Sequence, residues 1–269
     1  MDPHACMGPL HETAFRMVRV PPGHVARWLR LGWRDLRRSG WPSWLHGVLV
    51  SAVSLLLARA ALFDFYLLPG LATAFVLVGP MLATGLYGLS RRLEQGDRPR
   101  LKDALCAWWT ASQCLWGFSG LLVLVGLGWI AASAALFHLF IDEDVYDAWR
   151  FLYHVLTQDE HHFLLWTVAG ALVAALVFAM TVVAVPLLLE RNVTTRTAVL
   201  ASIRAVGENP VTMALWALTI ALLTLLGVAT AMLGFIVIYP LLGHASWRLY
   251  RDVVRADDRL APKRTDHAP

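Results

Sequence analysis

Four polar side chains near the end of the last apolar stretch have the types and the spacing of a small binding site. His244 and Arg248 are four residues apart, so on a helix they share one face. Tyr239 and Tyr250 flank them and would add two hydroxyl groups. The arrangement predicts a small polar pocket at the mouth of a membrane helix. The alternative is that these side chains only anchor the helix end at the membrane surface.

Two histidines are candidates for holding a cofactor. His46 and His244 lie near the ends of two different apolar stretches, and ionisable groups inside membrane helices often mark functional sites. A haem in an electron-transfer protein needs axial ligands deep in facing helices. The apolar stretches 65–89, 117–137 and 211–228 contain no histidine. No cofactor is therefore predicted, and haem stays open as the cofactor of an alternative function.

The sequence carries no recognisable catalytic or metal motif. Four histidines in or beside the acidic connection 138–161 could in principle bind a divalent metal, but their spacing matches no metal motif; they are His138, His154, His161 and His162. Fingerprints of hydrolases, zinc proteases, P-loops and dinucleotide-binding proteins are also missing. We predict no catalytic residue and no metal site, which favours a non-enzymatic protein.

The amino-acid composition indicates the class of protein to which the candidate residues belong. Of 269 residues, 58% are hydrophobic and only 16% are charged, whereas a soluble domain carries about 25% charged residues. The apolar residues form runs long enough to cross about 30 Å of hydrocarbon as helices. The sequence therefore predicts an all-α, polytopic membrane bundle.

The apolar runs divide the chain into six predicted spans within a membrane domain over 23–254. Residues 1–22 and 255–269 are expected to be disordered tails. The run 211–250 has no charge before Arg248, and as one helix it would be about 60 Å long, so we divide it near Gly227 to Gly234. The predicted spans are about 42–62, 65–89, 117–137, 162–189, 211–228 and 233–250.

Three amphipathic stretches precede the outward spans and predict an internal repeat. They cover about 24–38, 101–116 and 195–206, and each returning span carries a proline: Pro80, Pro186 or Pro240. This order predicts three parallel repeats of an interfacial amphipathic helix and a helical hairpin. Tryptophan and arginine on such helices favour the lipid headgroup region, so we expect lipid contact from Trp28, Arg30, Trp33, Arg34, Arg37, Trp108 and Trp109.

The distribution of basic residues predicts the orientation. All but Arg59 and Arg150 of the 23 lysines and arginines fall on the side of the two termini, and basic residues mark the cytoplasmic side. We expect a bacterial inner-membrane protein with both termini cytoplasmic, in contact with anionic phospholipid. Homo-oligomers or other membrane proteins are further expected partners. Nucleic acid is not expected, because no basic run is interleaved with exposed aromatic residues in a soluble domain.

Four stretches resemble a family of predicted bacterial inner-membrane proteins, the domain of unknown function 2189. They are WLRLGWRDLRRS (28–39), LVGPMLATGLYGLSRRLEQG (77–96), VPLLLER (185–191) and GFIVIYPLLGHASWRLYRD (234–252). The resemblance implies that the protein is located in a membrane, and it implies no particular activity. Some members are labelled cytochrome c oxidase subunit I, but the six-histidine ligand set of such a subunit is not present here.

Two classes of function follow from these observations. The first is a non-enzymatic membrane protein, either a transporter or permease-like bundle or a membrane accessory and assembly factor. The alternative is a redox or haem-associated subunit related to respiratory oxidases, which would rest on His46 and His244. A transporter predicts that a polar group such as Thr181, Tyr239 or His244 faces a cavity, whereas a scaffold predicts no such cavity.

Overall fold

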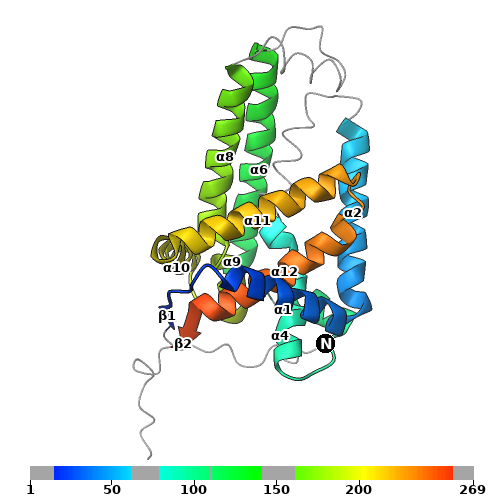
Figure 1. The fold of residues 1–269 in the computed structure, drawn as a ribbon, viewed down its shortest axis with the longest axis vertical. Coiled ribbons are helices and arrows are strands. Elements are labelled where there is room, and N and C mark those ends of the chain that lie inside the picture. Colours follow the sequence, from blue (N-terminus) through cyan, green and yellow to red (C-terminus); the bar gives the residue numbers. More distant parts are fainter. Residues whose placement is uncertain (1–14, 62–78, 110, 141–160, 257–269) are drawn as a thin grey trace, which may run out of the picture.

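The computed structural model describes residues 15–61, 79–109, 111–140 and 161–256 and confirms the all-helical class. Figure 1 shows the arrangement of these segments. A two-stranded sheet joins the two ends of the described chain. The helices are α1 (His24–Ser39), α2 (Trp41–Ala61), α4 (Thr84–Glu94), α5 (Leu101–Trp109), α6 (Gln113–Phe140), α8 (His162–Thr181), α9 (Ala184–Glu190), α10 (Thr195–Glu208), α11 (Pro210–Ala229) and α12 (Phe235–Val253), and the strands are β1 (Phe15–Met17) and β2 (Val254–Ala256).

Within the described residues, four helical segments have the length and hydropathy needed to cross a membrane. They are Trp41–Arg59, Gln113–Leu136, Leu164–Glu190 and Pro210–Ala229. They overlap the predicted spans 42–62, 117–137, 162–189 and 211–228. The predicted span 65–89 lies largely outside the described residues. The predicted span 233–250 forms α12, which is not among these four segments.

Helix α12 is the central element of the bundle. It packs most extensively on α1 and α2, and glycines permit the close approach. A Cβ atom on Gly47 of α2 would lie 2.1 Å from the carbonyl oxygen of Ile236, and a Cβ atom on Gly32 of α1 would lie 2.8 Å from the amide nitrogen of Ala245. Any side chain at Gly47 would therefore force the two helices apart, because a backbone carbonyl cannot rotate away as a flexible side chain can.

The uncharged stretch 211–250 forms two helices joined by a tight turn between Ala229 and Phe235. Ala231 and Met232 adopt positive φ angles of 51° and 68° in this turn. The left-handed region costs about 1 kcal/mol or more for a residue with a Cβ atom. The Ser51 hydroxyl of α2 donates to the Met232 carbonyl at 2.9 Å and fixes the turn against that helix.

The ends of the described chain are ordered together, which corrects part of the predicted tails. Strand β1 pairs antiparallel with β2, with Phe15 opposite Ala256. Val20 is buried, and its backbone is bonded to Asn209 and Thr212. Residues 15–22 and 255–256 thus belong to the fold, while 1–14 and 257–269 lie outside the described residues. Local periodicity could not reveal a strand whose partner lies more than 200 residues away in the chain.

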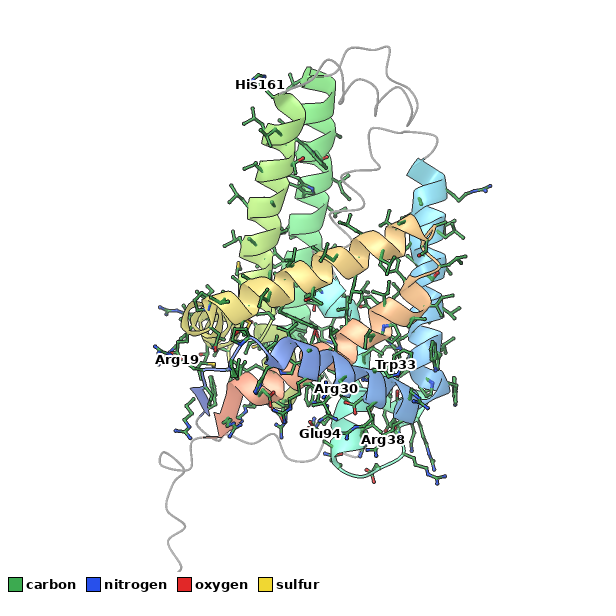
Figure 2. The ribbon with its side chains drawn as sticks, in the orientation of Figure 1. Arg19, Arg30, Trp33, Arg38, Glu94 and His161 are labelled. Atoms are coloured by element: carbon green, nitrogen blue, oxygen red, sulfur yellow. The ribbon has the colours of Figure 1, made fainter. Side chains whose placement is uncertain are left out.

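Charged residues gather at one end of the molecule. Figure 2 places Arg30, Arg38 and Glu94 at the end where α1 and α4 lie, and His161 at the opposite end of α8. Helices α2, α6 and α8 run roughly alongside one another between these ends, whereas α1, α11 and α12 run across them (Figure 1). The arrangement leaves one face of α12 toward α4 and α2 and another toward α8 and α11.

Candidate functional site

The first face of α12 holds a buried histidine enclosed by serines. His244 is 0% exposed. Its Nδ1 atom is bonded to Ser90 of α4 at 2.6 Å, and its Nε2 atom lies 2.9 Å from Ser43 of α2 and 3.4 Å from Ser39 of α1. A neutral imidazole has one donor and one acceptor nitrogen, and serine hydroxyls can satisfy both. His244 therefore links four helices, and both of its ring nitrogens are hydrogen-bonded.

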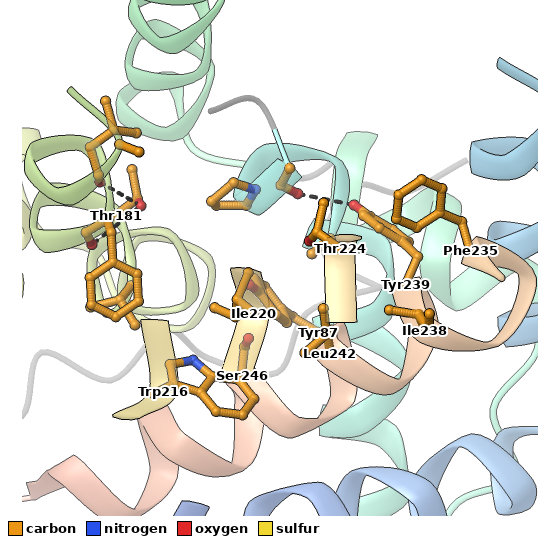
Figure 3. Close-up of a pocket in the computed structure, with 18 residues that line it drawn as sticks. Tyr87, Thr181, Trp216, Ile220, Thr224, Phe235, Ile238, Tyr239, Leu242 and Ser246 are labelled. Atoms are coloured by element: carbon orange, nitrogen blue, oxygen red, sulfur yellow. Dashed lines mark hydrogen bonds between the residues drawn. The ribbon is translucent and has the colours of Figure 1, made fainter. Parts of the chain in front are cut away.

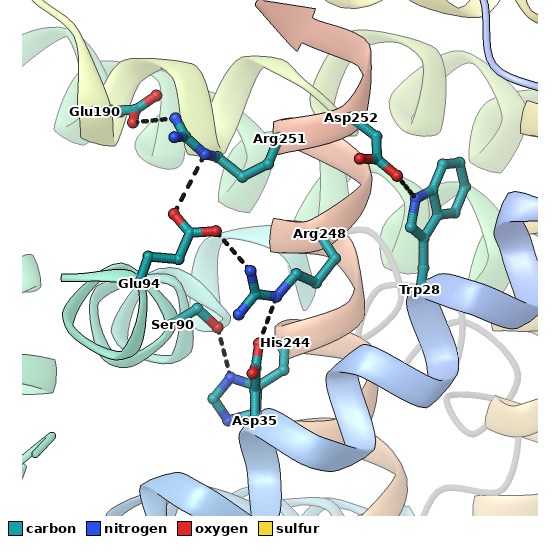
Figure 4. Close-up of polar contacts among 9 residues, drawn as sticks. All are labelled: Trp28, Asp35, Ser90, Glu94, Glu190, His244, Arg248, Arg251 and Asp252. Carbon is teal, nitrogen blue, oxygen red and sulfur yellow. Dashed lines mark hydrogen bonds and ion pairs between the residues drawn. The ribbon is translucent and has the colours of Figure 1, made fainter. Parts of the chain in front are cut away.

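One helical turn further along α12, an ion-pair network joins the helix ends (Figure 4). Arg248 donates from Nε to Asp35 of α1 at 2.6 Å and from Nη1 to Glu94 of α4 at 2.7 Å. Arg251 lies 3.2 Å from the same Glu94 carboxylate and donates to Glu190 of α9 at 2.7 Å. Helices α4, α9 and α12 thus meet at their charged ends. Each of the two guanidinium groups contacts two of the three carboxylates, so this is a structural network in which both arginines are paired within the protein.

Two further hydrogen bonds lie beside this ion-pair network. The Tyr250 hydroxyl donates to Glu190, and Asp252 accepts from the indole nitrogen of Trp28 at 2.8 Å. Burial raises the pKa of Glu94, while the neighbouring Arg251 and Arg248 act in the opposite direction. The two arginines therefore offset part of the rise in the pKa that burial produces.

The second face of α12 borders a cavity of about 130 Å³ (Figure 3). Its wall is mostly apolar and comes from four parts of the chain. The hydroxyls of Thr181 and Tyr239 reach it, but Thr181 donates to the Val177 carbonyl at 2.7 Å and Tyr239 to the Gly79 carbonyl at 3.0 Å. The lining residues are Gly79, Pro80, Ala83, Tyr87, Ala174, Val177, Phe178, Thr181, Val182, Trp216, Ile220, Thr224, Phe235, Ile238, Tyr239, Leu242, Gly243 and Ser246.

One polar atom in this wall has no partner. Trp216 is 0% exposed, and its indole N–H makes no hydrogen bond within the described part of the chain. Figure 3 draws the Trp216 ring with its nitrogen on the edge that faces the other lining side chains. Edge-to-face packing on Trp28, with centroids 5.8 Å apart, helps to fix the ring in place. The indole N–H groups of Trp129 and Trp247, which do not line the cavity, are likewise without a hydrogen-bond partner within the described residues.

The structure places the four residues of the predicted polar pocket in different surroundings. Tyr239 lines the apolar cavity, His244 lies among the serines, Arg248 joins the ion pairs and Tyr250 is bonded to Glu190. Neighbours four apart on α12 were correctly expected to share a face. On that face, His244 is 0% exposed beneath α1, α2 and α4, whereas the Arg248 side chain keeps 17% exposure.

The two cofactor candidates lie near the same junction. His46 is on α2 one turn from Ser43, and a Cβ atom on Gly85 of α4 would lie 2.7 Å from its Nε2 atom. His46 thus packs against α4, while His244 is held by the serines. Within the described residues, no group of three or more histidine, cysteine or carboxylate side chains could hold a metal ion.

The predicted lipid-facing set needs one correction. Trp28 is 0% exposed because its side of α1 packs on α12, and its N–H is used by Asp252. Trp33 and Trp109 are 42% and 82% exposed, and Trp108 is half-buried against Trp116 at 5.7 Å. The arginines Arg30, Arg34 and Arg37 are exposed. Lipid contact by the exposed members remains a prediction.

Sequence reasoning missed the partners that make these arrangements: Ser39, Ser43, Ser90, Asp35, Glu94, Glu190 and Trp216. Two signals could have found some of them. Asp35 is the single acid in the arginine-rich helix α1, and Glu94 and Glu190 each end a segment that carries a proline. A lone tryptophan within the aliphatic helix α11 is the corresponding signal for Trp216.

A family model described as predicted integral membrane protein (DUF2189) matches residues 67–190. The match confirms the family resemblance over this range, which contains α4, α5, α6, α8 and α9 and does not include α1, α2, α10, α11 or α12. No curated protein and no solved structure matches. Together with the apolar helices, the family match identifies an integral membrane protein.

Proposed function

We propose that this chain, similar over its central segment to a family of predicted integral membrane proteins, is a non-enzymatic, permease-like bundle that binds a largely apolar molecule. The observation that carries the proposal is the mostly apolar cavity beside α12. The ligand that fits this wall is mostly hydrocarbon. Water fits less well, because a buried water needs two to four polar partners.

The serine contacts of His244 favour this function over the redox alternative. An axial haem ligand presents an unengaged ring nitrogen to the iron. Both ring nitrogens of His244 instead meet serine hydroxyls from α2 and α4. The geometry therefore gives His244 the role of a connector between helices.

A cavity-filling pair of substitutions tests the proposed ligand site. Ala174 lines the cavity, whereas Ala221 on α11 is exposed and is not among the lining residues. We expect native mass spectrometry of the purified protein to show a bound apolar molecule that Ala174→Phe loses and the matched control Ala221→Phe retains. A bare wild-type chain, or the same adduct on Ala174→Phe, would contradict the proposal.

The orientation proposed for the bundle places both termini in the cytoplasm of a bacterial cell. The clustering of Arg30 and Arg38 at one end of the molecule supports it, because basic residues are retained on the cytoplasmic side. Reporter fusions after residues 96 and 195 should therefore be active in the cytoplasm, and fusions within 140–160 in the periplasm. The opposite pattern of reporter activity would contradict the proposed orientation.

A further inference from the structure

The hairpin of α11 and α12 begins and ends at the same face of the molecule. At the start of α11, the Asn209 side chain accepts from the Val20 amide at 2.7 Å, and the Thr212 hydroxyl donates to the Val20 carbonyl at 2.8 Å. At the end of α12, the Val253 carbonyl accepts from the Val18 amide at 2.8 Å. Both ends are thus tied to the short segment between β1 and α1.

The turn of this hairpin lies level with the middle of α2. Ser51, which bonds to Met232, is ten residues after Trp41, the first residue of α2. Ten residues of helix correspond to about 15 Å, or half of the roughly 30 Å hydrocarbon layer that α2 is long enough to cross. The hairpin reaches only this depth, because α11 and α12 run across α2 and not alongside it (Figure 1).

The backbone of the turn satisfies its own hydrogen bonds. Every amide from Thr230 to Ile238 donates to an acceptor within the hairpin. The Thr230 hydroxyl accepts from the Gly234 amide at 2.9 Å, and Ser51 supplies a donor to the Met232 carbonyl. Hydrocarbon offers no partners to an irregular backbone, so a turn at membrane depth must be satisfied in this way.

The exposed surface of the hairpin is apolar up to its tip. Leu233 in the turn is 59% exposed, and α11 presents exposed leucines along its length, among them Leu218 at 53% and Leu225 at 63%. No charged residue occurs between Pro210 and Trp247. A turn at an aqueous surface is normally rich in polar residues, and this one is not.

We propose that α11 and α12 form a re-entrant hairpin that occupies only the half of the bilayer nearer the termini. Its tip ends near the bilayer centre, and the exposed leucine face of α11 contacts the acyl chains of that one leaflet. This topology replaces the two full crossings predicted for 211–228 and 233–250. Helix α11 is long enough to span a membrane, but its direction in the bundle does not use that length. The proposal is independent of the ligand proposed for the cavity.

Depth measurement by spin labelling tests the hairpin in the full-length protein. Single cysteines are introduced at Leu233 in the turn and at Arg59 near the far end of α2, after the native cysteines have been replaced. The labelled protein is reconstituted into phospholipid vesicles, and collision rates with oxygen and with a water-soluble nickel chelate are measured. We expect the oxygen-to-nickel ratio to be several-fold higher at 233 than at 59.

Two outcomes would overturn the re-entrant hairpin. A nickel collision rate at 233 equal to that at 59 would place the turn at the outer surface, as two full crossings require. A ratio at 233 that matches a fully exposed control at Asp97 would place it in water on the near side. If the Leu233 cysteine variant does not fold, the exposed neighbour Ala229 serves as a second labelling site with the same expected depth.

Discussion

Replacing Asp35 with leucine is expected to destabilise the folded protein by about 3 kcal/mol, because it removes one partner of a buried ion pair. Asp35 is 1% exposed and its carboxylate accepts from Arg248 at 2.6 Å. The arginine is 17% exposed and would keep only Glu94 as a counter-charge. We place the cost at the lower end of the range for buried pairs since that second partner remains. Unfolding by titration of a denaturing detergent in mixed micelles would measure the change.

Two matched variants separate the buried pair from general charge effects. Glu208→Gln breaks the surface pair with Arg204, whose side chain is 73% exposed, and should change stability by less than about 0.5 kcal/mol. The double variant Asp35→Leu with Arg248→Met should recover most of the loss, because no unpaired charge is left buried. Equal losses for Asp35→Leu and Glu208→Gln would show that the network does not hold the helix ends together.

The structure shows which parts of this arrangement a sequence pattern can predict. Apolar runs and their lengths are local properties, so the helices around 42–62, 117–137 and 162–189 were predicted with useful boundaries. The spacing of His244 and Arg248 also correctly placed them on one face of a helix. The burial of that face could not be predicted, because it is produced by Asp35, Ser43 and Glu94, which lie at least 150 residues earlier in the chain.

Trp28 illustrates a second limit of the pattern. Tryptophan and arginine alternate around α1 in the way that membrane-surface helices show. The same alternation suits a helix whose apolar side packs on protein, and Gly32 allows α12 to approach that side closely. Periodicity reports that a helix has two faces, and only the packing partner decides whether the apolar face meets lipid or another helix.

The direction of a helix within the bundle is a third property that composition cannot predict. The stretch 211–250 has the length and hydropathy of two crossings, and the structure divides it into two helices as its length suggests. The tilt of these helices is set by contacts such as Ser51 with Met232 and Gly47 with Ile236. These contacts join α2 to residues far along the chain, so they cannot be deduced from either segment alone.

Replacing His244 with alanine is expected to cost about 2–4 kcal/mol of folding free energy, since it leaves a cavity and removes the partners of buried hydroxyls. The imidazole joins α12 to Ser43 and Ser90 on two other helices. His244→Gln keeps one donor and one acceptor at the end of a side chain of similar length. It should therefore recover at least half of the loss. The matched control is His161→Ala, because His161 is exposed and its removal should have almost no effect.

The glutamine variant also decides between a connector and a reactive group. A connector needs only the two hydrogen bonds, so stability and ligand retention should both return toward wild type in His244→Gln. A histidine that serves as a haem ligand or proton carrier cannot be replaced by an amide, which neither titrates nor ligates iron well. If His244→Ala were as stable as the wild type while His244→Gln had lost a bound coloured cofactor, the serine enclosure would be incidental and the redox function would replace the permease-like one.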